Sequence, residues 1–204
     1  GLSNDVVYII SQDKRGYMWF GTNDKLNKFD GYDFTIYKND PEDPETISSN
    51  SASNMYIDSS DNIWIGTWGG GLIKYDYTKK YFTTYKYDEN DPYSISDNRV
   101  QTIYEDDSNT LWIGTYEGGL NKFDKKEEKF IRYQHNPNNP ESISNNRIWA
   151  ITSDNNGNLI IATSNGLNYY NTERKEFKKY FHNSKSKKSI ASSSVRTLHL
   201  GKQG

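Results

Sequence analysis

The chain has 204 residues, with 25 Lys and Arg against 27 Asp and Glu, no Cys and 15% aromatic residues. The aromatic content predicts an ordered fold, because disordered chains are poor in aromatic residues. The near balance of charge provides no electrostatic attraction for nucleic acid, so we expect no nucleic-acid partner. The lack of cysteine excludes disulfides and thiolate metal sites. Apolar runs reach only about four residues against the roughly 20 that cross a bilayer, so we expect no membrane contact by this segment.

Two sequence motifs recur along the chain in one phase. The first is a block of the form Trp-x-Gly-Thr, and the second is an isoleucine that precedes Ser and lies three residues after a proline, except that the fourth repeat has Ala191 and Lys187 at these positions. The first motif begins at Trp19, Trp64, Trp112 and Ile160, with spacings of 45, 48 and 48 residues. The second runs through Ile47, Ile95, Ile143 and Ile190. Two motifs that keep the same phase indicate internal repeats.

Each repeat has the pattern of four short strands. In the third repeat we expect strands at 100–104, 111–115, 120–123 and 129–133, because short β-rich runs alternate with turn residues. Asp106-Asp107-Ser108-Asn109 predicts the turn of the first hairpin, and Gly118-Gly119 interrupts the second. No run of eleven or more residues carries the helical period, so helices should be nearly absent.

A repeat of 45 to 48 residues that holds four strands is typical of a β-propeller blade. We therefore predict an all-β fold, a partial β-propeller over residues 1–204 with four-stranded antiparallel blades. The predicted blades cover about 2–47, 48–95, 96–143 and 144–190, and 191–204 would begin a fifth with a strand at 195–200. Trp19, Trp64 and Trp112 are expected to pack between blades, and Ile160 takes this position in the fourth.

Several motifs together resemble the two-component regulator propeller repeats. They are Gly-Leu-Ser-Asn at the start, the Trp-Ile-Gly-Thr blocks, Gly-Gly-Leu-Asn-Lys-Phe-Asp at 118–124 and Asn-Pro-Glu-Ser-Ile-Ser-Asn-Asn at 139–146. The resemblance covers essentially the whole chain. It implies part of a seven-bladed propeller on the periplasmic or extracellular side of a bacterial membrane. There it would act as the sensor of a membrane-anchored signalling protein, typically a hybrid two-component histidine kinase, and many such sensors respond to oligosaccharides.

The chain departs from the repeat pattern at two places. Lys25 stands where later repeats carry glycine, so its loop is expected either to avoid a positive φ or to adopt it at an energetic cost. The fourth repeat has Ile160 and Ala162 in place of Trp and Gly, and its linker 183–189 lacks both prolines. These departures affect the regularity of the first and fourth blades.

No group of residues has the spacing of a catalytic or metal site. The histidines, His135, His182 and His199, are scattered, and the aspartates recur at turn positions, where each can cap its own backbone. The run 154–158 begins like a calcium loop but lacks the Glu at position twelve, so a hairpin turn is favoured there. We expect no catalytic residue, no metal and no cofactor in this segment; an output kinase or diguanylate cyclase would lie outside it.

The loop after each Trp-x-Gly-Thr block is the first candidate binding position. Its residues differ between repeats while the flanks stay constant, as a ligand site added to a repeat would require. The variable pairs are Asn23-Asp24, Trp68-Gly69, Tyr116-Glu117 and Ser164-Asn165. Trp68 and Tyr116 could offer flat faces to a sugar, with Glu117 beside them, or they could pack over the neighbouring blade.

The entry to each first strand is the second candidate position. Arg99 and Arg147 are aligned there. First strands of a propeller line its central channel, so the two arginines could converge near the mouth of that channel. Paired guanidinium groups suit the carboxylate or sulfate of an acidic sugar. The alternative is a plain salt bridge to a linker acid such as Glu141. Trp149 varies as well, and it either contributes to this site or fills space between blades.

The sequence therefore favours a non-enzymatic sensor that binds an oligosaccharide or another small ligand. The alternative is a scaffold for protein–protein interaction or self-association, including a homodimer, without a small ligand. A glycosidase or lyase would need two convergent carboxylates, and turn chemistry already accounts for the acids that recur with the repeat.

Overall fold

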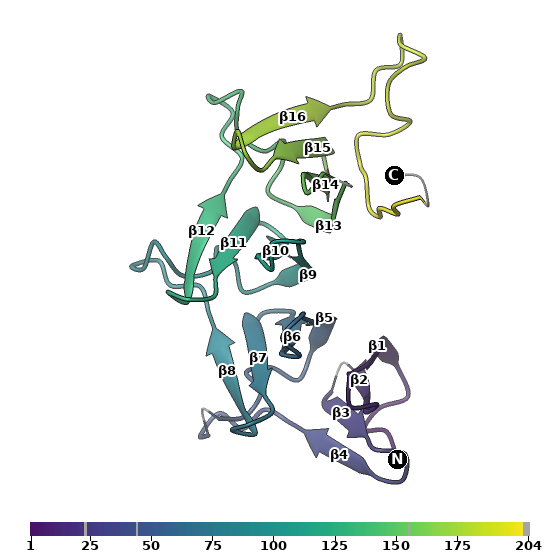
Figure 1. Cartoon of the computed structure of the whole chain (residues 1–204), viewed down its shortest axis with the longest axis vertical. Helices are drawn as coiled ribbons and strands as arrows, with labels where there is room; N and C mark the ends of the chain where they lie inside the picture. The colour runs from purple at the N-terminus through teal and green to yellow at the C-terminus, as the bar shows by residue number, and fades with distance from the viewer. Residues whose placement is uncertain (23, 44, 155, 202–204) are drawn as a thin grey trace. The chain divides into compact units, whose positions relative to one another are not determined.

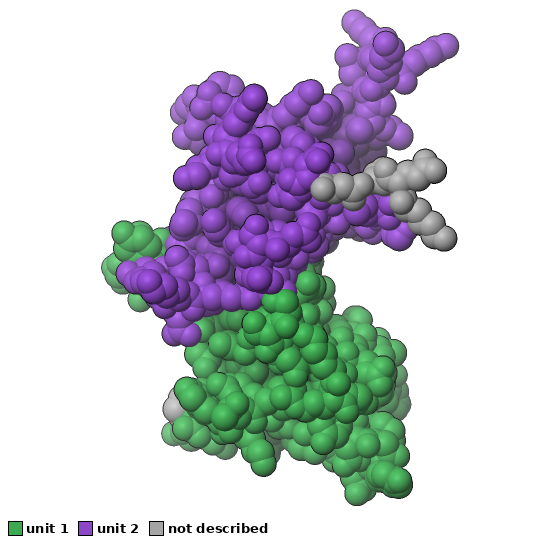
Figure 2. All heavy atoms as spheres, viewed as in Figure 1, with its two compact units in different colours: residues 1–103 green, residues 104–204 purple. Residues whose placement is uncertain are grey.

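A computed structural model describes residues 1–22, 24–43, 45–154 and 156–201. All regular elements within these residues are strands, and they form four antiparallel sheets of four strands each (Figure 1). No helix among them could span a membrane. The chain divides into two compact units, unit 1 at Gly1–Ile103 and unit 2 at Tyr104–Gly204 (Figure 2). The predicted all-β class and the four-stranded antiparallel blades are confirmed.

Each sheet uses strands that are consecutive in the sequence. The first sheet holds β1 (Val7–Gln12), β2 (Met18–Thr22), β3 (Leu26–Phe29) and β4 (Phe34–Tyr37). The second holds β5 (Ala52–Ile57), β6 (Ile63–Thr67), β7 (Leu72–Asp76) and β8 (Tyr81–Tyr85). The third holds β9 (Val100–Glu105), β10 (Leu111–Thr115), β11 (Leu120–Asp124) and β12 (Lys129–Tyr133). The fourth holds β13 (Ile148–Ser153), β14 (Leu159–Thr163), β15 (Gly166–Asn171) and β16 (Glu176–Tyr180).

The four predicted strands of the third repeat agree with β9 to β12 within one residue at each end. The strand predicted at 195–200 is not formed, which corrects that expectation. A first strand gains its ladder of hydrogen bonds from a second strand, and none follows before Gly201. This segment is held instead by local contacts, among them the Val195 amide, which donates to the Thr163 carbonyl at 3.0 Å.

A buried aspartate organises the first hairpin of each of the first three sheets. In the third sheet, Asp106 Oδ1 accepts from the backbone amides of Ser108 and Thr110, both at 2.9 Å. The second oxygen, Oδ2, accepts from Trp112 Nε1 at 2.7 Å. The same indole–carboxylate bond joins Trp19 to Asp13 at 2.7 Å and Trp64 to Asp58 at 3.0 Å. The aspartate thus holds the turn and the tryptophan together, a second role beyond the predicted turn.

The fourth sheet keeps the aspartate although it has lost the tryptophan. Asp154 Oδ1 accepts from the backbone amide of Asn158 at 2.9 Å, and Oδ2 accepts from the Tyr169 hydroxyl at 2.9 Å. Tyr169 lies opposite Ile160 in the register, where the third sheet pairs a lysine with its tryptophan. Burial opposes ionisation of Asp154, but hydrogen bonds from the Asn158 and Asn156 amides, the Tyr169 hydroxyl and the Asn158 side chain together lower the pKa of this carboxyl. Tyr169 therefore replaces the missing indole as donor.

The predicted packing between sheets is confirmed for Trp19 and Trp112, while that of Trp64 stays a prediction because the next sheet belongs largely to the other unit. In unit 1, Trp19 of the first sheet lies 5.5 Å from Tyr75 of the second, measured between ring centroids, and shares a buried cluster with Ile63. In unit 2, Trp112 of the third sheet lies 5.8 Å from Tyr170 of the fourth. Within each unit the cluster buries apolar side chains of both sheets, which stabilises the unit through the hydrophobic effect.

The loops after β6 and β10 require glycine. Gly71 and Gly119 have φ values of 87° and 90°, and a Cβ at either position would overlap a carbonyl oxygen of the fourth strand, Tyr85 or Tyr133. The corresponding loop of the first sheet is one residue shorter. Lys25 in that loop is not among the described non-glycine residues with positive φ, in agreement with the first of the two expectations.

One face of the first sheet carries two exposed isoleucines. The register Ile10–Phe20–Asn27–Ile36 places these residues on the face opposite Trp19, with Ile10 65% and Ile36 46% exposed. The corresponding face of the second sheet, which includes Ile65 and Ile73, is buried against Trp19. We name the residues Ile10, Phe20 and Ile36 the free face of the first sheet.

Replacing Asp106 with alanine should destabilise unit 2, because the substitution leaves two backbone amides and the buried Trp112 indole without an acceptor. We expect a loss of about 2–4 kcal/mol in the free energy of unfolding, measured by urea denaturation followed through tryptophan fluorescence. Asp107→Ala is the matched control: this neighbour is exposed, so the change should be about 0.5 kcal/mol or less. Equal losses for the two variants would show that the indole–carboxylate bond has no special role.

Candidate ligand-binding site

Two backbone segments of unit 2 bring four of the predicted site residues together. Tyr116 and Glu117 lie in the loop between β10 and β11, while Arg147 and Trp149 lie at the start of β13. The Gly119 amide donates to the Asn146 carbonyl at 2.9 Å, which ties the loop to the segment before β13. Adjacent sheets thereby position these side chains next to one another.

Arg147 is the centre of this group. Its guanidinium carbon lies 3.9 Å from the centroid of the Tyr116 ring, and its Nη2 lies 3.6 Å from Glu117 Oε1. The side chains of Arg147 and Glu117 are 34% and 58% exposed, so their ion pair is screened by water and weak. Arg147 therefore forms a salt bridge, as the alternative predicted, but its partner is Glu117 of the loop and not Glu141.

Trp149 borders the same group from β13. Its ring meets the Tyr116 ring edge-on, with centroids 6.3 Å apart and an interplanar angle of 90°. Trp149 Nε1 donates to Ser164 Oγ at 2.9 Å. The Arg196 guanidinium carbon lies 5.2 Å from the centroid of the Trp149 ring. The indole is partly exposed, its N–H is fixed, and it contacts a ring from the neighbouring sheet, so both predicted roles for Trp149, in a ligand site and in packing between blades, stay predictions.

Arg196 is the residue that sequence reasoning missed. Arg196 follows Val195 as Trp149 follows Ile148 in the fourth repeat, so Arg196 and Trp149 occupy the same repeat position. This alignment is the sequence feature from which Arg196 could have been identified as a candidate site residue.

We name the group the arginine site and define it by six residues: Tyr116, Glu117, Arg147, Trp149, Ser164 and Arg196.

The arginine site combines two guanidinium groups, one carboxylate and two aromatic rings set at a right angle. Guanidinium forks match the geometry of a carboxylate or sulfate, and their placement over aromatic rings keeps them partly desolvated. Aromatic faces next to them suit the apolar face of a ring-shaped ligand. The arrangement can therefore hold a ring that carries a negative charge.

The two predicted site residues of unit 1 are arranged differently. Trp68 is 46% exposed and its backbone bridges to that of Arg99. Arg99 pairs with Asp97 through two contacts, Nε to Oδ1 at 3.2 Å and Nη2 to Oδ2 at 3.0 Å, again a partner other than Glu141. Arg99 and Arg147 belong to different units, so their convergence stays a prediction. Asn23 of the predicted loop set lies outside the described residues.

The aspartates and histidines have local roles. Asn155 of the run that begins like a calcium loop lies outside the described residues, and Asp154 accepts the turn amides instead. His135 Nδ1 lies 2.8 Å from the Ile143 carbonyl, and His182 Nδ1 lies 2.9 Å from that of Ile190, so both rings contact their own linkers. In the described ranges, no three His, Asp or Glu residues are grouped to hold a metal ion.

Comparison with known proteins identifies related sequences. The family model described as "Two component regulator propeller" matches residues 1–24, 46–69, 94–117 and 142–165. A curated relative, histidine kinase P4 of Formosa agariphila, is 58% identical over 48 residues, which are 24% of this chain and 4% of that kinase. The matched part of the chain is thus a small fraction of the relative.

Solved structures share the fold over most of the chain. The extracellular domain of a one-component system from Bacteroides thetaiotaomicron superposes with a TM-score of 0.73 and 26% identity, covering 89% of this chain and 26% of that one. The extracellular domain of a hybrid two-component system from that species gives a TM-score of 0.65 and 25% identity, covering 98% of this chain and 38% of that one. Each matched segment spans the first two strands of one four-stranded sheet, so the four repeats of this chain belong to the two-component regulator propeller family.

Proposed function

We propose that this chain is a ligand-sensing part of a propeller in a bacterial two-component-type signalling protein, located on the periplasmic or extracellular side of the membrane. Its family and its structural neighbours, which are described as extracellular domains of signalling systems, support this role. The output domain, a kinase or a cyclase, would belong to another part of the polypeptide.

The observation that carries the proposal is the arginine site. Its residues occupy the positions that vary between repeats, while the strands beneath them repeat closely. Arg147 rests on Tyr116 at 3.9 Å and Arg196 faces Trp149 at 5.2 Å, so two cations lie over two aromatic rings. We infer that this site takes an oligosaccharide or another small ligand that carries an acid group.

Ligand binding at this site would link three successive repeats. Tyr116 belongs to the third, Arg147 and Trp149 to the fourth, and Arg196 to the segment that follows it. A ligand held by all of them restricts their relative motion, because each contact is lost when one repeat moves. Such a restriction can be passed on to a neighbouring domain as a shift in population.

We do not expect the arginine site to cleave its ligand. Glycoside hydrolysis uses two carboxylates that flank the scissile bond. Of the six residues that define the arginine site, Glu117 alone is a carboxylate, and it is paired with Arg147. The ligand is therefore expected to leave the site chemically unchanged.

Removing the central guanidinium should weaken binding of an acidic ligand. For Arg147→Ala we expect the Kd of a short uronic-acid oligosaccharide to rise about 10- to 100-fold, the effect of losing a charge-assisted hydrogen bond. Isothermal titration calorimetry measures this, with the neutral oligosaccharide of the same linkage as reference. Arg174→Ala, an exposed arginine in the turn before β16, is the matched control and should bind normally. An unchanged Kd for Arg147→Ala would reject the site.

Neutralising Glu117 should have the opposite effect. Its carboxylate competes with an acidic ligand for Arg147, so Glu117→Gln is expected to lower the Kd of the same uronic-acid oligosaccharide by about 2- to 5-fold, in keeping with the small strength of an exposed ion pair. The gain should shrink at high salt, because screening weakens exposed charge pairs. Weaker binding in this variant would mean that Glu117 contacts the ligand directly as an acceptor.

A second function, self-association, is supported by the free face of the first sheet. In the second sheet the corresponding face is covered by Trp19 of the first sheet. A sheet of the same type could therefore cover the free face of the first sheet. We infer that a second copy of the chain can provide that sheet and form a homodimer.

Static light scattering over a range of concentrations tests this association. We expect a dimer that Ile10→Asp converts to a monomer, because a buried charge at the interface has no partner. Ile131→Asp is the matched control: Ile131 on β12 is 50% exposed but is not part of the free face. A monomer at every concentration, or equal effects of the two variants, would contradict the dimer.

A further inference from the structure

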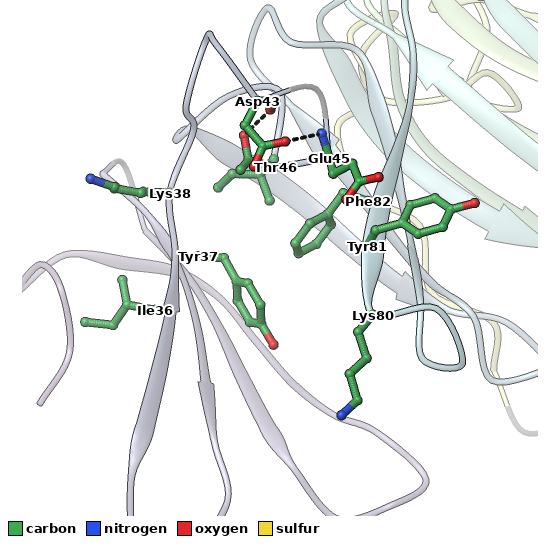
Figure 3. A pocket seen from close by; sticks show the side chains of 10 residues that line it. Ile36, Tyr37, Lys38, Asp43, Glu45, Thr46, Lys80, Tyr81 and Phe82 are labelled. Atoms are coloured by element: carbon green, nitrogen blue, oxygen red, sulfur yellow. Dashed lines mark hydrogen bonds between the residues drawn. The ribbon is translucent and has the colours of Figure 1, made fainter.

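Unit 1 contains a cavity of about 450 Å³ at the junction of its two sheets, apart from the arginine site. This volume lies in the range of small-molecule sites. The cavity is lined by Arg15, Tyr17, Lys28, Tyr37, Tyr75, Tyr77 and Lys80. A second cavity of about 360 Å³ shares Tyr37 and Lys80 with it, and Figure 3 shows the Tyr37 hydroxyl and the Lys80 ammonium group directed toward the same end. We name the seven lining residues the tyrosine groove.

The walls of the tyrosine groove are aromatic. Tyr37 of β4 lies 5.9 Å from Tyr75 of β7, and Tyr75 lies 5.0 Å from Tyr77, all between ring centroids. The three rings are inclined to one another, and all three line the cavity. Burial is the main cause that raises the pKa of Tyr37 and of Tyr77, so both hydroxyls stay protonated, and the proton of Tyr77 is donated to Asp13.

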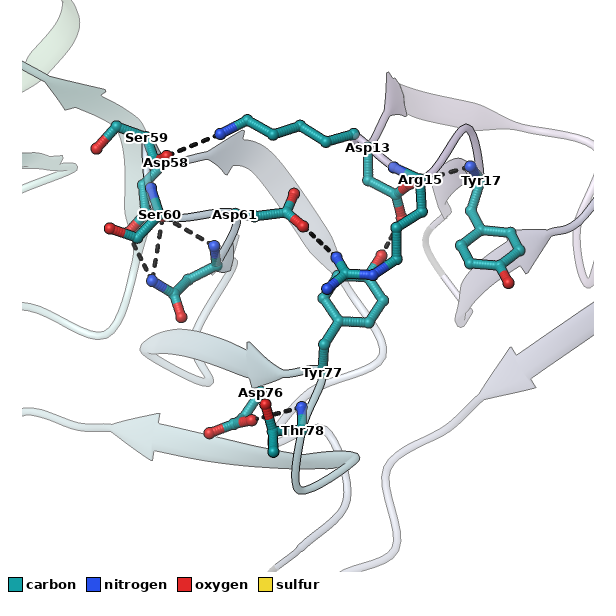
Figure 4. Close-up of polar contacts among 12 residues, drawn as sticks. Asp13, Arg15, Tyr17, Asp58, Ser59, Ser60, Asp61, Asp76, Tyr77 and Thr78 are labelled. Atoms are coloured by element: carbon teal, nitrogen blue, oxygen red, sulfur yellow. Dashed lines mark hydrogen bonds and ion pairs between the residues drawn. The ribbon is translucent and has the colours of Figure 1, made fainter.

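A set of polar contacts holds one wall in place (Figure 4). The Tyr77 hydroxyl donates to Asp13 Oδ2, the same oxygen that accepts from the Trp19 indole. The Arg15 guanidinium carbon lies 3.7 Å from the centroid of the Tyr77 ring, and Arg15 forms an ion pair with Asp61. Tyr77 is therefore fixed on both sides, so this part of the groove is organised before any ligand arrives.

The lining of the groove carries three cationic groups and no carboxylate. Arg15 forms an ion pair with Asp61, which partly neutralises its charge. Lys28 Nζ lies 4.7 Å from the centroid of the Tyr17 ring. Lys80 is in the exposed turn between β7 and β8. A cavity with this lining attracts anions, and its rings can contact the flat face of a cyclic ligand.

The equivalent junction of unit 2 shows that packing alone does not require this lining. Its cavity of about 320 Å³ retains Lys122, Tyr133, Tyr170 and Lys175 at the positions of Lys28, Tyr37, Tyr75 and Lys80. Three other positions differ: Ser108, Thr110 and Thr172 stand where unit 1 has Arg15, Tyr17 and Tyr77, and Glu173 adds a carboxylate. Both junctions bury their tryptophan equally well. The arginine and the two extra tyrosines are therefore additions to a common frame.

We propose that the tyrosine groove is a second binding site, which takes a saccharide unit that bears a sulfate or a carboxylate. The ammonium group of Lys80, between the two cavities, binds the anion together with Lys28, and the rings of Tyr37 and Tyr77 contact the sugar. This site is separate from the arginine site, and the inference does not depend on the proposed sensor function.

Reversing the charge of Lys80 tests the proposal. Lys80→Glu suits the turn, because Glu128 occupies the same turn position in the third sheet with a φ of 53° against 59° for Lys80. Lys175→Glu makes the same change at the equivalent turn of unit 2, where φ is also 59°, and serves as the matched control. The probes are a sulfated disaccharide, the same disaccharide with a carboxylate in place of the sulfate, its uncharged form and inorganic sulfate, each titrated by calorimetry.

We expect the charged disaccharides to bind the unaltered chain and Lys80→Glu to raise their Kd at least about 10-fold, while Lys175→Glu leaves it unchanged. The uncharged disaccharide and inorganic sulfate should bind more weakly than the charged disaccharides, because each lacks one half of the recognised group. No binding of either charged disaccharide, or equal losses in the two variants, would overturn the proposal. If inorganic sulfate bound as tightly as the charged disaccharides, the groove would recognise only the anion and not the sugar, and the proposal would be overturned.

A second pair of variants tests the sugar contact and separates the two sites. Tyr77→Thr copies Thr172 of unit 2, so it should fold and yet weaken the charged disaccharides, whereas Thr172→Ser should have no effect. All measurements are repeated with Arg147→Ala, which removes the arginine site. A loss on Lys80→Glu that persists in this background supports the groove, whatever the outcome for the sensor function. If the loss disappears in this background, the groove is not an independent site.

Discussion

The hydrogen bond between a buried carboxylate and an indole N–H is the interaction on which each of the first three sheets depends. One aspartate oxygen holds the hairpin turn and the other fixes the tryptophan, whose ring then fills the space against the next sheet wherever that neighbour lies in the same unit. Turn geometry, side-chain orientation and packing are thus coupled through a single side chain. Tyr169 restores the donor in the fourth sheet, which shows that the carboxylate needs a partner of some kind when the indole is absent.

This coupling leaves the surrounding positions free to vary. The loops between the second and third strands are held by threonine and glycine contacts such as Thr115 Oγ1 to the Gly119 carbonyl at 2.9 Å, so their outermost residues need not contribute to stability. The turns of the first hairpins are likewise held by backbone amides. Tyr116 uses the first freedom, and Arg15 and Tyr17 use the second. Both candidate sites therefore include residues at positions where the repeated frame places few demands on the side chain.

Much of the candidate site could be inferred from the repeats alone. Tyr116, Glu117, Arg147 and Trp149 were distinguished because they vary at fixed positions, and they do lie together. The pairing of Arg147 with Glu117 and of Arg99 with Asp97 was not foreseen, since several acids are near each arginine in sequence and only side-chain direction selects among them. The tyrosine groove was missed because its residues are far apart along the chain and belong to two different repeats.

The sequence by itself determined the all-β class, the four repeats, their strands and the buried tryptophans, because each of these follows from local propensity and from a period that the chain displays directly. Only the tertiary structure decided which side chains meet between sheets, such as Tyr77 with Asp13 and Arg147 with Tyr116. Residues 195–200 form no strand with any of the described residues. Contacts between repeats depend on the register and twist of adjacent sheets, which no single repeat encodes.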